Sequence, residues 1–204
     1  MTTAPIGLIA ILRGLTPAEA PAVGDALYGA GLRAIEVPLN SPDPLDSVRE
    51  LRARLPGDCR VGAGTVLTPG QVADAAEAGA RMIVAPNTDP AVISAAAELG
   101  LDCYPGAATP TEAFTAVAAG ASALKLFPAD HIGVSGMKAW SSVLPAGTPL
   151  LPVGGVDEAN LGDWLAAGAA GAGIGSSLYR PGDAPGAVAE RAHALTACWA
   201  RHTR

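Results

Sequence analysis

Short runs of apolar residues recur along the chain at nearly even spacing, and each run is followed by turn residues and then by a stretch with helical periodicity. The eight runs begin near Leu8, Ala34, Arg60, Met82, Asp102, Ala123, Leu150 and Gly171. Successive starts lie 20 to 27 residues apart, which matches a strand, a loop, a short helix and a second loop. Because no linker or charge block divides the chain, the pattern predicts one α/β domain over residues 1–204, a compact (β/α)8 TIM barrel with a parallel eight-stranded sheet.

Glycine and proline mark the expected ends of the helices. A glycine lies two or three residues before five of the runs, where a helix C-terminus favours a residue that tolerates positive φ: Gly31, Gly79, Gly100, Gly120 and Gly168. Thr16, Thr68 and Thr109 are each followed by proline and, three residues on, by glutamate or glutamine, which together form an N-cap signal. Asp89-Pro90 has the capping residue and the proline of this signal without the later glutamate or glutamine. Helices are therefore expected to start just after strands 1, 3, 4 and 5.

An open doubly wound sheet also alternates strands and helices, and it is the alternative architecture. No Gly-x-Gly-x-x-Gly motif opens the first helix, however, and the densest glycine run, residues 171–175, lies in the last unit. The barrel is therefore favoured.

Composition narrows the classes of partner. Thirteen Lys and Arg against nineteen Asp and Glu give a net charge of -6, which argues against a nucleic acid or an anionic membrane as partner. Charged residues make up only 16% of the chain and hydrophobic residues 50%, so a second subunit is expected to cover part of the surface. The three cysteines lie far apart in the sequence and are expected to be reduced thiols. Residues 1–14 do not resemble a signal peptide, and no segment is long and apolar enough to span a membrane, so a cytoplasmic protein is expected.

Ionisable residues interrupt strands that should be buried on both faces. Glu36 lies between branched aliphatic residues in the second run, Lys125 lies between leucines in the sixth, and Arg13 ends the first. Since side chains alternate along a strand, Lys125 shares a face with Ala123 and Phe127. Lys125 and Glu36 are therefore expected to point into the barrel near the carboxyl ends of their strands, where barrel enzymes place their active sites.

Two interpretations of this pair are possible. Glu36 and Lys125 either form a buried salt bridge that orders the barrel, or they form a reactive pair. A lysine desolvated among leucine and phenylalanine has a lowered pKa and becomes a nucleophilic amine, while a neighbouring carboxylate moves protons, which is the equipment for Schiff-base chemistry. The reactive pair is favoured, because a buried ion pair contributes little to stability. Lys138 has no such setting and is expected to be a solvated helix residue.

Glycines at the ends of the last two strands form a second signal. Gly154 and Gly155 follow strand 7, and Gly175 and Ser176 follow strand 8. Exposed backbone N–H groups at this corner of a barrel commonly bind a phosphate group. The three histidines show no spacing that could gather metal ligands, so neither a metal nor a cofactor is expected.

Several segments match a known family in order and spacing. They are Leu8-Ile9-Ala10-Ile11-Leu12-Arg13-Gly14, Glu36-Val37-Pro38-Leu39-Asn40-Ser41-Pro42, Val61-Gly62-Ala63-Gly64-Thr65-Val66-Leu67, Ala123-Leu124-Lys125-Leu126-Phe127-Pro128 and Val153-Gly154-Gly155-Val156. The chain resembles the 2-keto-3-deoxy-6-phosphogluconate and 6-phosphogalactonate aldolases over nearly its whole length. The resemblance implies a homotrimer of small barrels that uses no metal. It also implies class I aldol cleavage of a 6-phosphorylated 2-keto-3-deoxy sugar acid to pyruvate and D-glyceraldehyde 3-phosphate.

The resemblance assigns roles to individual positions. Lys125 matches the Schiff-base lysine, and Glu36 matches the general acid and base. Substrate-contacting positions are matched by Arg13, Thr65 and Phe127, and the phosphate corner is matched by Gly154, Gly155, Gly175 and Ser176.

Two positions depart from part of the family. Asn40 stands where phosphogluconate aldolases have an arginine near the pyruvate carboxylate, so the chain resembles the phosphogalactonate branch, and Arg13 and Thr65 are left as candidates to hold that carboxylate. Tyr104 replaces a residue that is often small or cysteine, and it alters either the pocket wall or only the packing. The alternatives in function are a phosphogluconate or dual-epimer aldolase, a sugar-phosphate isomerase or epimerase, and a non-catalytic trimeric barrel.

Overall fold

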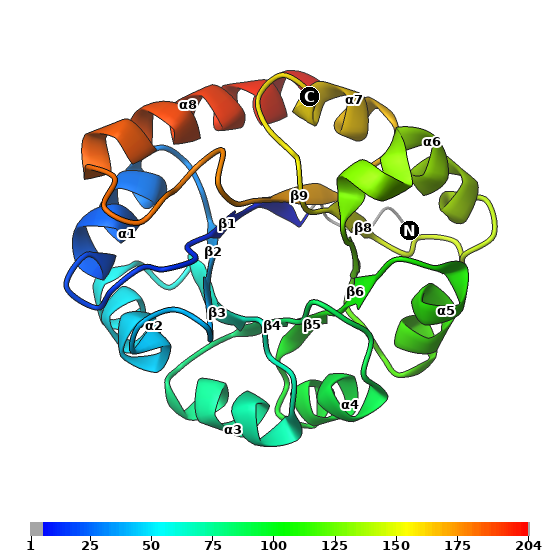
Figure 1. The fold of residues 1–204 in the computed structure, drawn as a ribbon, viewed down its shortest axis with the longest axis horizontal. Coiled ribbons are helices and arrows are strands. Elements are labelled where there is room, and N and C mark those ends of the chain that lie inside the picture. Colours follow the sequence, from blue (N-terminus) through cyan, green and yellow to red (C-terminus); the bar gives the residue numbers. More distant parts are fainter. Residues whose placement is uncertain (1–5, 204) are drawn as a thin grey trace.

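The computed structural model describes residues 6–203; residues 1–5 and 204, which the predicted domain also includes, lie outside the described residues. The strands are all parallel and form two sheets, with order β5-β4-β3-β2-β1-β9 in one and β6-β7-β8 in the other. Their bounds are β1 Gly7–Ile11, β2 Ala34–Pro38, β3 Arg60–Gly64, β4 Met82–Val84, β5 Asp102–Tyr104, β6 Gly106–Ala107, β7 Leu124–Leu126, β8 Leu150–Pro152 and β9 Gly171–Ile174. Figure 1 shows the strands around the middle of the molecule and the helices outside them.

Each of the eight predicted apolar runs contains strand structure, and the fifth contains two strands. Pro105 separates β5 from β6 because proline has no N–H to donate to a neighbouring strand. β5 pairs with β4, whereas β6 pairs with β7, so this one run takes part in both sheets. A single parallel bridge between Val153 and Gly173 joins the ends of β8 and β9.

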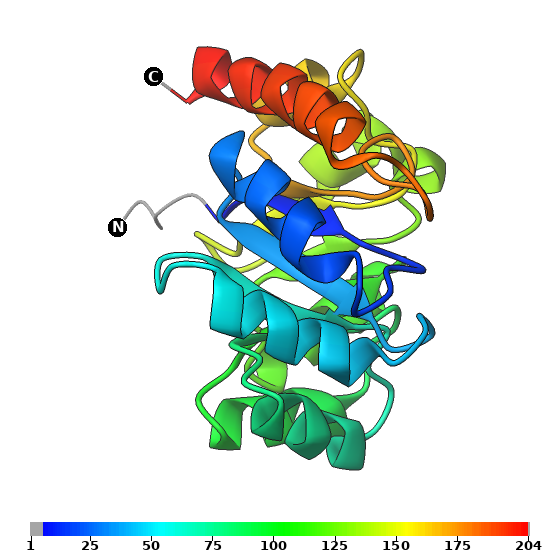
Figure 2. The same cartoon turned by 90° about the vertical axis from the view of Figure 1, so that its left-hand side faces the viewer.

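Eight helices lie in the described part of the chain, on the outside of the sheets; seven of them lie between strands, and α8 follows the last strand. Their bounds are α1 Ala20–Gly29, α2 Pro44–Arg54, α3 Pro69–Glu77, α4 Pro90–Glu98, α5 Pro110–Ala118, α6 Ala129–Ser141, α7 Leu161–Ala166 and α8 Pro185–His202. The view in Figure 2 shows neighbouring helices lying against the side of the strands. None of the helices within residues 6–203 is long and apolar enough to cross a membrane.

Most of the predicted helix ends are confirmed. Thr68 and Asp89 accept hydrogen bonds from backbone N–H groups at the starts of α3 and α4, and Thr109 forms a capping box with Glu112 at α5. The five predicted C-terminal glycines all have positive φ. The expectation for Thr16 is wrong: residues 16–19 form a separate turn closed by the Glu19 N–H on the Thr16 carbonyl, and α1 begins only at Ala20.

The apolar core has two parts. The larger part fills the space between the strands and the helices and includes Leu124 and Leu126. The smaller part lies on the other face of the strands and consists of Ile9, Ala34, Met82, Val84, Tyr104, Ala123 and Leu151, with Ile6 packed against it. Ala34 and Met82 begin their strands and Ala123 immediately precedes β7, whereas Val84 and Tyr104 end theirs.

Tyr104 belongs to the packing and not to the wall of the cavity. Its side chain is buried in the smaller core cluster. Arg60 donates to the Tyr104 hydroxyl at 3.1 Å and to the Ile6 carbonyl at 2.7 Å. Of the two expected effects of this residue, the structure shows core packing, with the hydroxyl group bonded to Arg60.

Candidate active site

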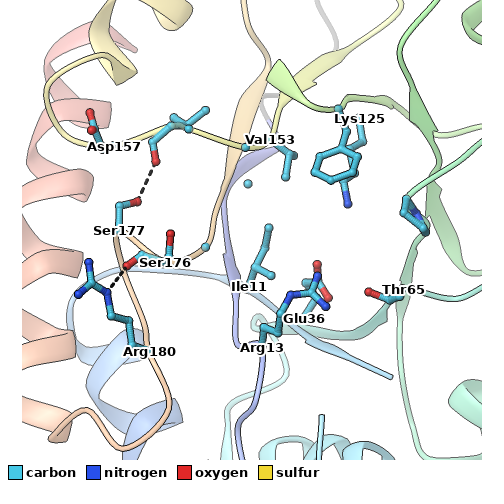
Figure 3. A pocket seen from close by; sticks show the side chains of 17 residues that line it. Ile11, Arg13, Glu36, Thr65, Lys125, Val153, Asp157, Ser176, Ser177 and Arg180 are labelled. Atoms are coloured by element: carbon cyan, nitrogen blue, oxygen red, sulfur yellow. Dashed lines mark hydrogen bonds between the residues drawn. The ribbon is translucent and has the colours of Figure 1, made fainter. Parts of the chain in front are cut away.

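A cavity of about 340 Å³ opens at the carboxyl ends of the strands (Figure 3). All nine predicted site residues line it: Arg13, Glu36, Thr65, Lys125, Phe127, Gly154, Gly155, Gly175 and Ser176. They come from β1, β2, β3, β7, β8 and β9 or from the residues directly after these strands. Parallel strands bring their carboxyl ends to one side of the fold, and this explains how residues so distant in the sequence meet.

Lys125 lies in the middle of β7 and is only 7% exposed. Leu124 and Leu126 pack toward the helices, and Lys125 faces the cavity, as the alternation predicts. Its Nζ lies 4.7 Å from the centroid of the Phe127 ring. Burial lowers the pKa of this amine, and the charge of Arg13 lowers it further, while Glu36 acts in the opposite direction.

Glu36 is buried in β2 with 2% of its surface exposed. Burial raises the pKa of its carboxyl group to about 7, although the positive charges of Lys125 and Arg13 oppose this shift. Its Oε2 atom is buried and has no hydrogen-bond partner in the protein. Within residues 6–203, no ion pair of 4.0 Å or less joins Glu36 to Lys125, so the alternative of a buried salt bridge is not found.

Both side chains therefore line the same cavity with no ion pair between them, and Figure 3 shows Lys125 above Glu36 in this view. An amine with a lowered pKa and a carboxyl group with a pKa of about 7 are suited to act as a nucleophile and a proton-transfer group. Burial disfavours the charged form of each, which is the electrostatic condition that a Schiff-base lysine needs.

Arg13 and Thr65 lie at the same end of the cavity as Glu36 (Figure 3). The Arg13 guanidinium donates a hydrogen bond to the Asn40 side-chain carbonyl, which comes from the loop after β2. Thr65 has φ 55°, a left-handed conformation that is strained for a β-branched residue. A cation and a hydroxyl group are thereby fixed next to the predicted nucleophile.

Gly154, Gly155 and Gly175 line the part of the cavity that the loops after β8 and β9 form. Gly154 and Gly155 have φ of 98° and 72°, so larger residues would be strained at these positions. The Ser177 hydroxyl donates to the Val156 carbonyl at 2.8 Å and links the loops after β8 and β9. The cavity wall here also includes Arg180, which the sequence did not mark as a site residue.

Asp157 and Arg180 are charged cavity residues that sequence reasoning missed, and Ser177 is a further polar one. Each lies in a loop after a strand, where side-chain alternation no longer predicts direction. The usable signal was their position: a charged or amide residue a few places beyond the carboxyl end of a barrel strand is a candidate site residue.

A metal site would need clustered ligands. No group of three or more histidine, cysteine, aspartate or glutamate side chains in the described part of the chain is placed to hold a metal ion. The three cysteines are buried free thiols, and burial raises the pKa of Cys59 and of Cys103. The expectation that the protein uses no metal or cofactor stays a prediction.

Comparison with known proteins gives the family. Residues 1–184 match the family model described as KDPG and KHG aldolase. The chain belongs to the KDPG and KHG aldolase family. The family resemblance seen in the sequence motifs is thus confirmed.

Two relatives of this aldolase-family chain are similar over almost their full length. A probable 2-dehydro-3-deoxy-6-phosphogalactonate aldolase of Rhizobium meliloti is 51% identical over 94% of this chain and 91% of the relative. The 2-dehydro-3-deoxy-6-phosphogalactonate aldolase of Escherichia coli is 47% identical over 92% of each chain.

Solved structures support the same family. A structure described as native KDPGal superposes with a TM-score of 0.94, is 44% identical and covers 99% of this chain and 97% of its own. A KDPG aldolase from Legionella pneumophila, in which pyruvate was captured as a covalent carbinolamine intermediate, has a TM-score of 0.85, is 28% identical and covers 94% of this chain and 95% of its own.

Proposed function

We propose that the protein is a class I aldolase, a lyase that cleaves 2-dehydro-3-deoxy-6-phosphogalactonate to pyruvate and D-glyceraldehyde 3-phosphate. The observation that carries the proposal is the placement of buried Lys125 and buried Glu36 on one cavity with no ion pair between them. The names of the two relatives above support this substrate, and the captured carbinolamine in the Legionella enzyme supports covalent chemistry in the family.

In the proposed reaction, the neutral amine of Lys125 attacks the C2 ketone and forms a carbinolamine. Glu36 gives a proton to the departing hydroxyl group, water leaves, and a protonated imine forms. The Glu36 carboxylate then takes the proton of the C4 hydroxyl group, directly or through a water molecule. The C3–C4 bond breaks, its electrons move into the imine, and the aldehyde leaves. Protonation and hydrolysis of the remaining enamine release pyruvate and restore the amine.

The two anionic ends of the substrate are assigned to the two ends of the cavity. Arg13 and Thr65 are the candidates for the carboxylate, because they lie beside Glu36 at the reactive end. Phe127 packs against the lysine and helps to exclude water. Gly154, Gly155, Gly175 and Ser176 form the corner for the phosphate group, whose position would hold the scissile bond in place.

The finer architecture is also a proposal: one domain with a closed (β/α)8 barrel. Two observations support closure, namely the run over residues 102–107 that pairs into both sheets and the bridge between Val153 and Gly173. A homotrimer is supported by exposed apolar side chains that a second subunit would cover, namely Leu67, Leu99, Phe114 and Val143. A cytoplasmic location and the absence of nucleic-acid or membrane partners stay predictions.

Borohydride trapping tests the covalent step. Reduction in the presence of pyruvate should attach the pyruvate carbon skeleton irreversibly to Lys125, as read by mass spectrometry of peptides. Lys138 is the matched control, because it is the other lysine of the chain and lies exposed on α6. Lys125→Ala should abolish labelling and pyruvate release, while Lys138→Ala should retain both. No adduct on the native protein would refute the covalent route.

The alternatives give different results in the same experiments. An isomerase or epimerase would retain some activity in Lys125→Arg, whereas the aldolase should lose nearly all of it. A non-catalytic barrel would release no pyruvate from either sugar acid. Pyruvate release from the phosphogalactonate and phosphogluconate substrates, measured side by side, separates the proposed enzyme from a phosphogluconate or dual-epimer aldolase.

A further inference from the structure

Arg180 lies in the loop between β9 and α8, at the glycine end of the cavity. Figure 3 shows it beside Ser176 and across the cavity from Lys125. Its side chain is exposed, and its Nε–H donates to the Ser176 carbonyl at 3.2 Å. The N–H groups of its terminal nitrogens are left for a ligand, because arginine presents its donors as a planar fork.

The loop that carries Arg180 is held in place on both sides. The Arg180 backbone N–H donates to the Asp183 carboxylate at 3.0 Å. The same carboxylate forms an ion pair with Arg191 of α8, and Arg191 also donates to the Leu178 carbonyl at 2.8 Å. These contacts hold the backbone at Arg180 next to the cavity.

Its charge is not matched by a neighbouring acid. Asp183 already pairs with Arg191, and among residues 6–203 no carboxylate lies within ion-pair distance of the Arg180 side chain. Asp157 lines the same cavity, but its carboxylate accepts the backbone N–H groups of Ala159 and Asn160.

The other two cationic side chains of the cavity wall are Arg13 and Lys125, and the charge of each lowers the pKa of Glu36. Arg180 and Arg13 also line an adjoining pocket together with Gly175 and Ser176, and of the two arginines Arg180 is the one bonded to the Ser176 backbone. A chain with a net charge of -6 repels a dianion at long range, so a local cation has a large effect on its binding.

We propose that Arg180 binds the phosphate group of the substrate and makes the enzyme select phosphorylated over unphosphorylated aldehydes. The inference rests on the proposed function and adds a specificity-determining side chain to a corner otherwise built from backbone N–H groups and serine. An arginine suits this task because its fork matches the geometry of phosphate oxygens.

The test compares two aldehydes in the condensation direction, with pyruvate as the common partner. For Arg180→Gln, kcat/KM with D-glyceraldehyde 3-phosphate should fall by about 10- to 100-fold, the range expected for a lost hydrogen bond to a charged group. With unphosphorylated D-glyceraldehyde, kcat/KM should stay within about twofold, since that aldehyde has no group for Arg180 to bind. Arg180→Lys should lose less kcat/KM than Arg180→Gln, because lysine keeps the positive charge but lacks the paired donors of the guanidinium group.

Arg201→Gln is the matched control, since it removes one exposed arginine on α8 and should leave the ratio of the two kcat/KM values unchanged. Thermal unfolding of each variant checks that the loop change does not unfold the protein. An unchanged ratio in Arg180→Gln, or an equal loss with both aldehydes, would overturn the inference. Failure of the native protein to form a borohydride-trapped pyruvate adduct would instead refute the proposed function.

Discussion

Gly64 provides the sharpest test of how the fold holds Glu36. Gly64 ends β3 and pairs with Pro38 of β2, so its missing side chain lies beside the strand that carries Glu36. A Cβ atom built at Gly64 would lie 2.7 Å from Glu36 Oε1 and closer still to Oε2 and Cδ. Real Cβ atoms essentially never approach other heavy atoms within 3.0 Å, so in Gly64→Ala the carboxyl group has to move.

The size of the effect follows from this overlap. All three atoms of the carboxyl group clash, so the group must shift as a unit, by about 1 Å or more. A misplacement of about 1 Å in a catalytic geometry costs about 100-fold in rate, and we expect kcat to fall by that factor. Because Glu36 is almost fully buried, overpacking should also lower the free energy of unfolding by about 1–3 kcal/mol.

The assay measures pyruvate release from the phosphorylated sugar acid, together with denaturant unfolding of the same preparations. Gly70→Ala is the control: Gly70 is the second residue of α3, and the nearest atom to an added Cβ is Thr68 Oγ1 at 3.9 Å. This control should keep kcat within about twofold, because the site is untouched. A Gly64→Ala enzyme with the native kcat would show that the position of the Glu36 carboxyl group does not matter for the reaction.

Two further predictions follow from the same end of the cavity. Burial raises the pKa of Glu36 from near 4.5 to about 7, so the native state keeps a proton that the unfolded chain loses, and the stability contribution is lost as pH rises through about 7. The loss of free energy of unfolding is at most about 3 kcal/mol, and Glu36→Gln should remove it. Denaturant unfolding at a series of pH values measures this; equal slopes of the free energy of unfolding against pH for both proteins would contradict the prediction. Asn40→Ala removes the hydrogen bond that orients the Arg13 guanidinium. KM for pyruvate should therefore rise by about 2- to 10-fold, with a smaller change in kcat. An unchanged KM in condensation kinetics would contradict this prediction.

The strand and helix pattern was largely predictable because local chemistry and the fold agree. Thr109, for example, caps α5 through the reciprocal bonds with Glu112 that its sequence predicts. The same signal failed at Thr16, because its bonds to Glu19 close a separate turn before α1 instead of its first turn. Equal local motifs can thus serve a cap or a turn, and only the packing of the loop after β1 decides between them.

The reactive end of the site was also predictable, and the rest of it only in part. Lys125 and Glu36 stand in strands, where alternation fixes the direction of a side chain relative to its neighbours. Asn40 and Arg180 stand in loops, which have no such period, and their directions depend on contacts made between distant segments, such as the bond between Asp183 and the Arg180 backbone. Long-range contacts of this kind leave no pattern in a single sequence.

Burial of Glu36 and Lys125 does more in the proposed reaction than lower one pKa and raise another. It favours the neutral acid and the neutral amine together, and these are the protonation states that nucleophilic attack and loss of water require. Once the protonated imine forms, its nitrogen carries a positive charge, and this charge favours ionisation of Glu36. The carboxyl group therefore changes from proton donor to proton acceptor when the next step needs a base. An ion pair between Glu36 and Lys125 would have fixed both charges from the start, and no such pair is present among residues 6–203, which is what permits this sequence.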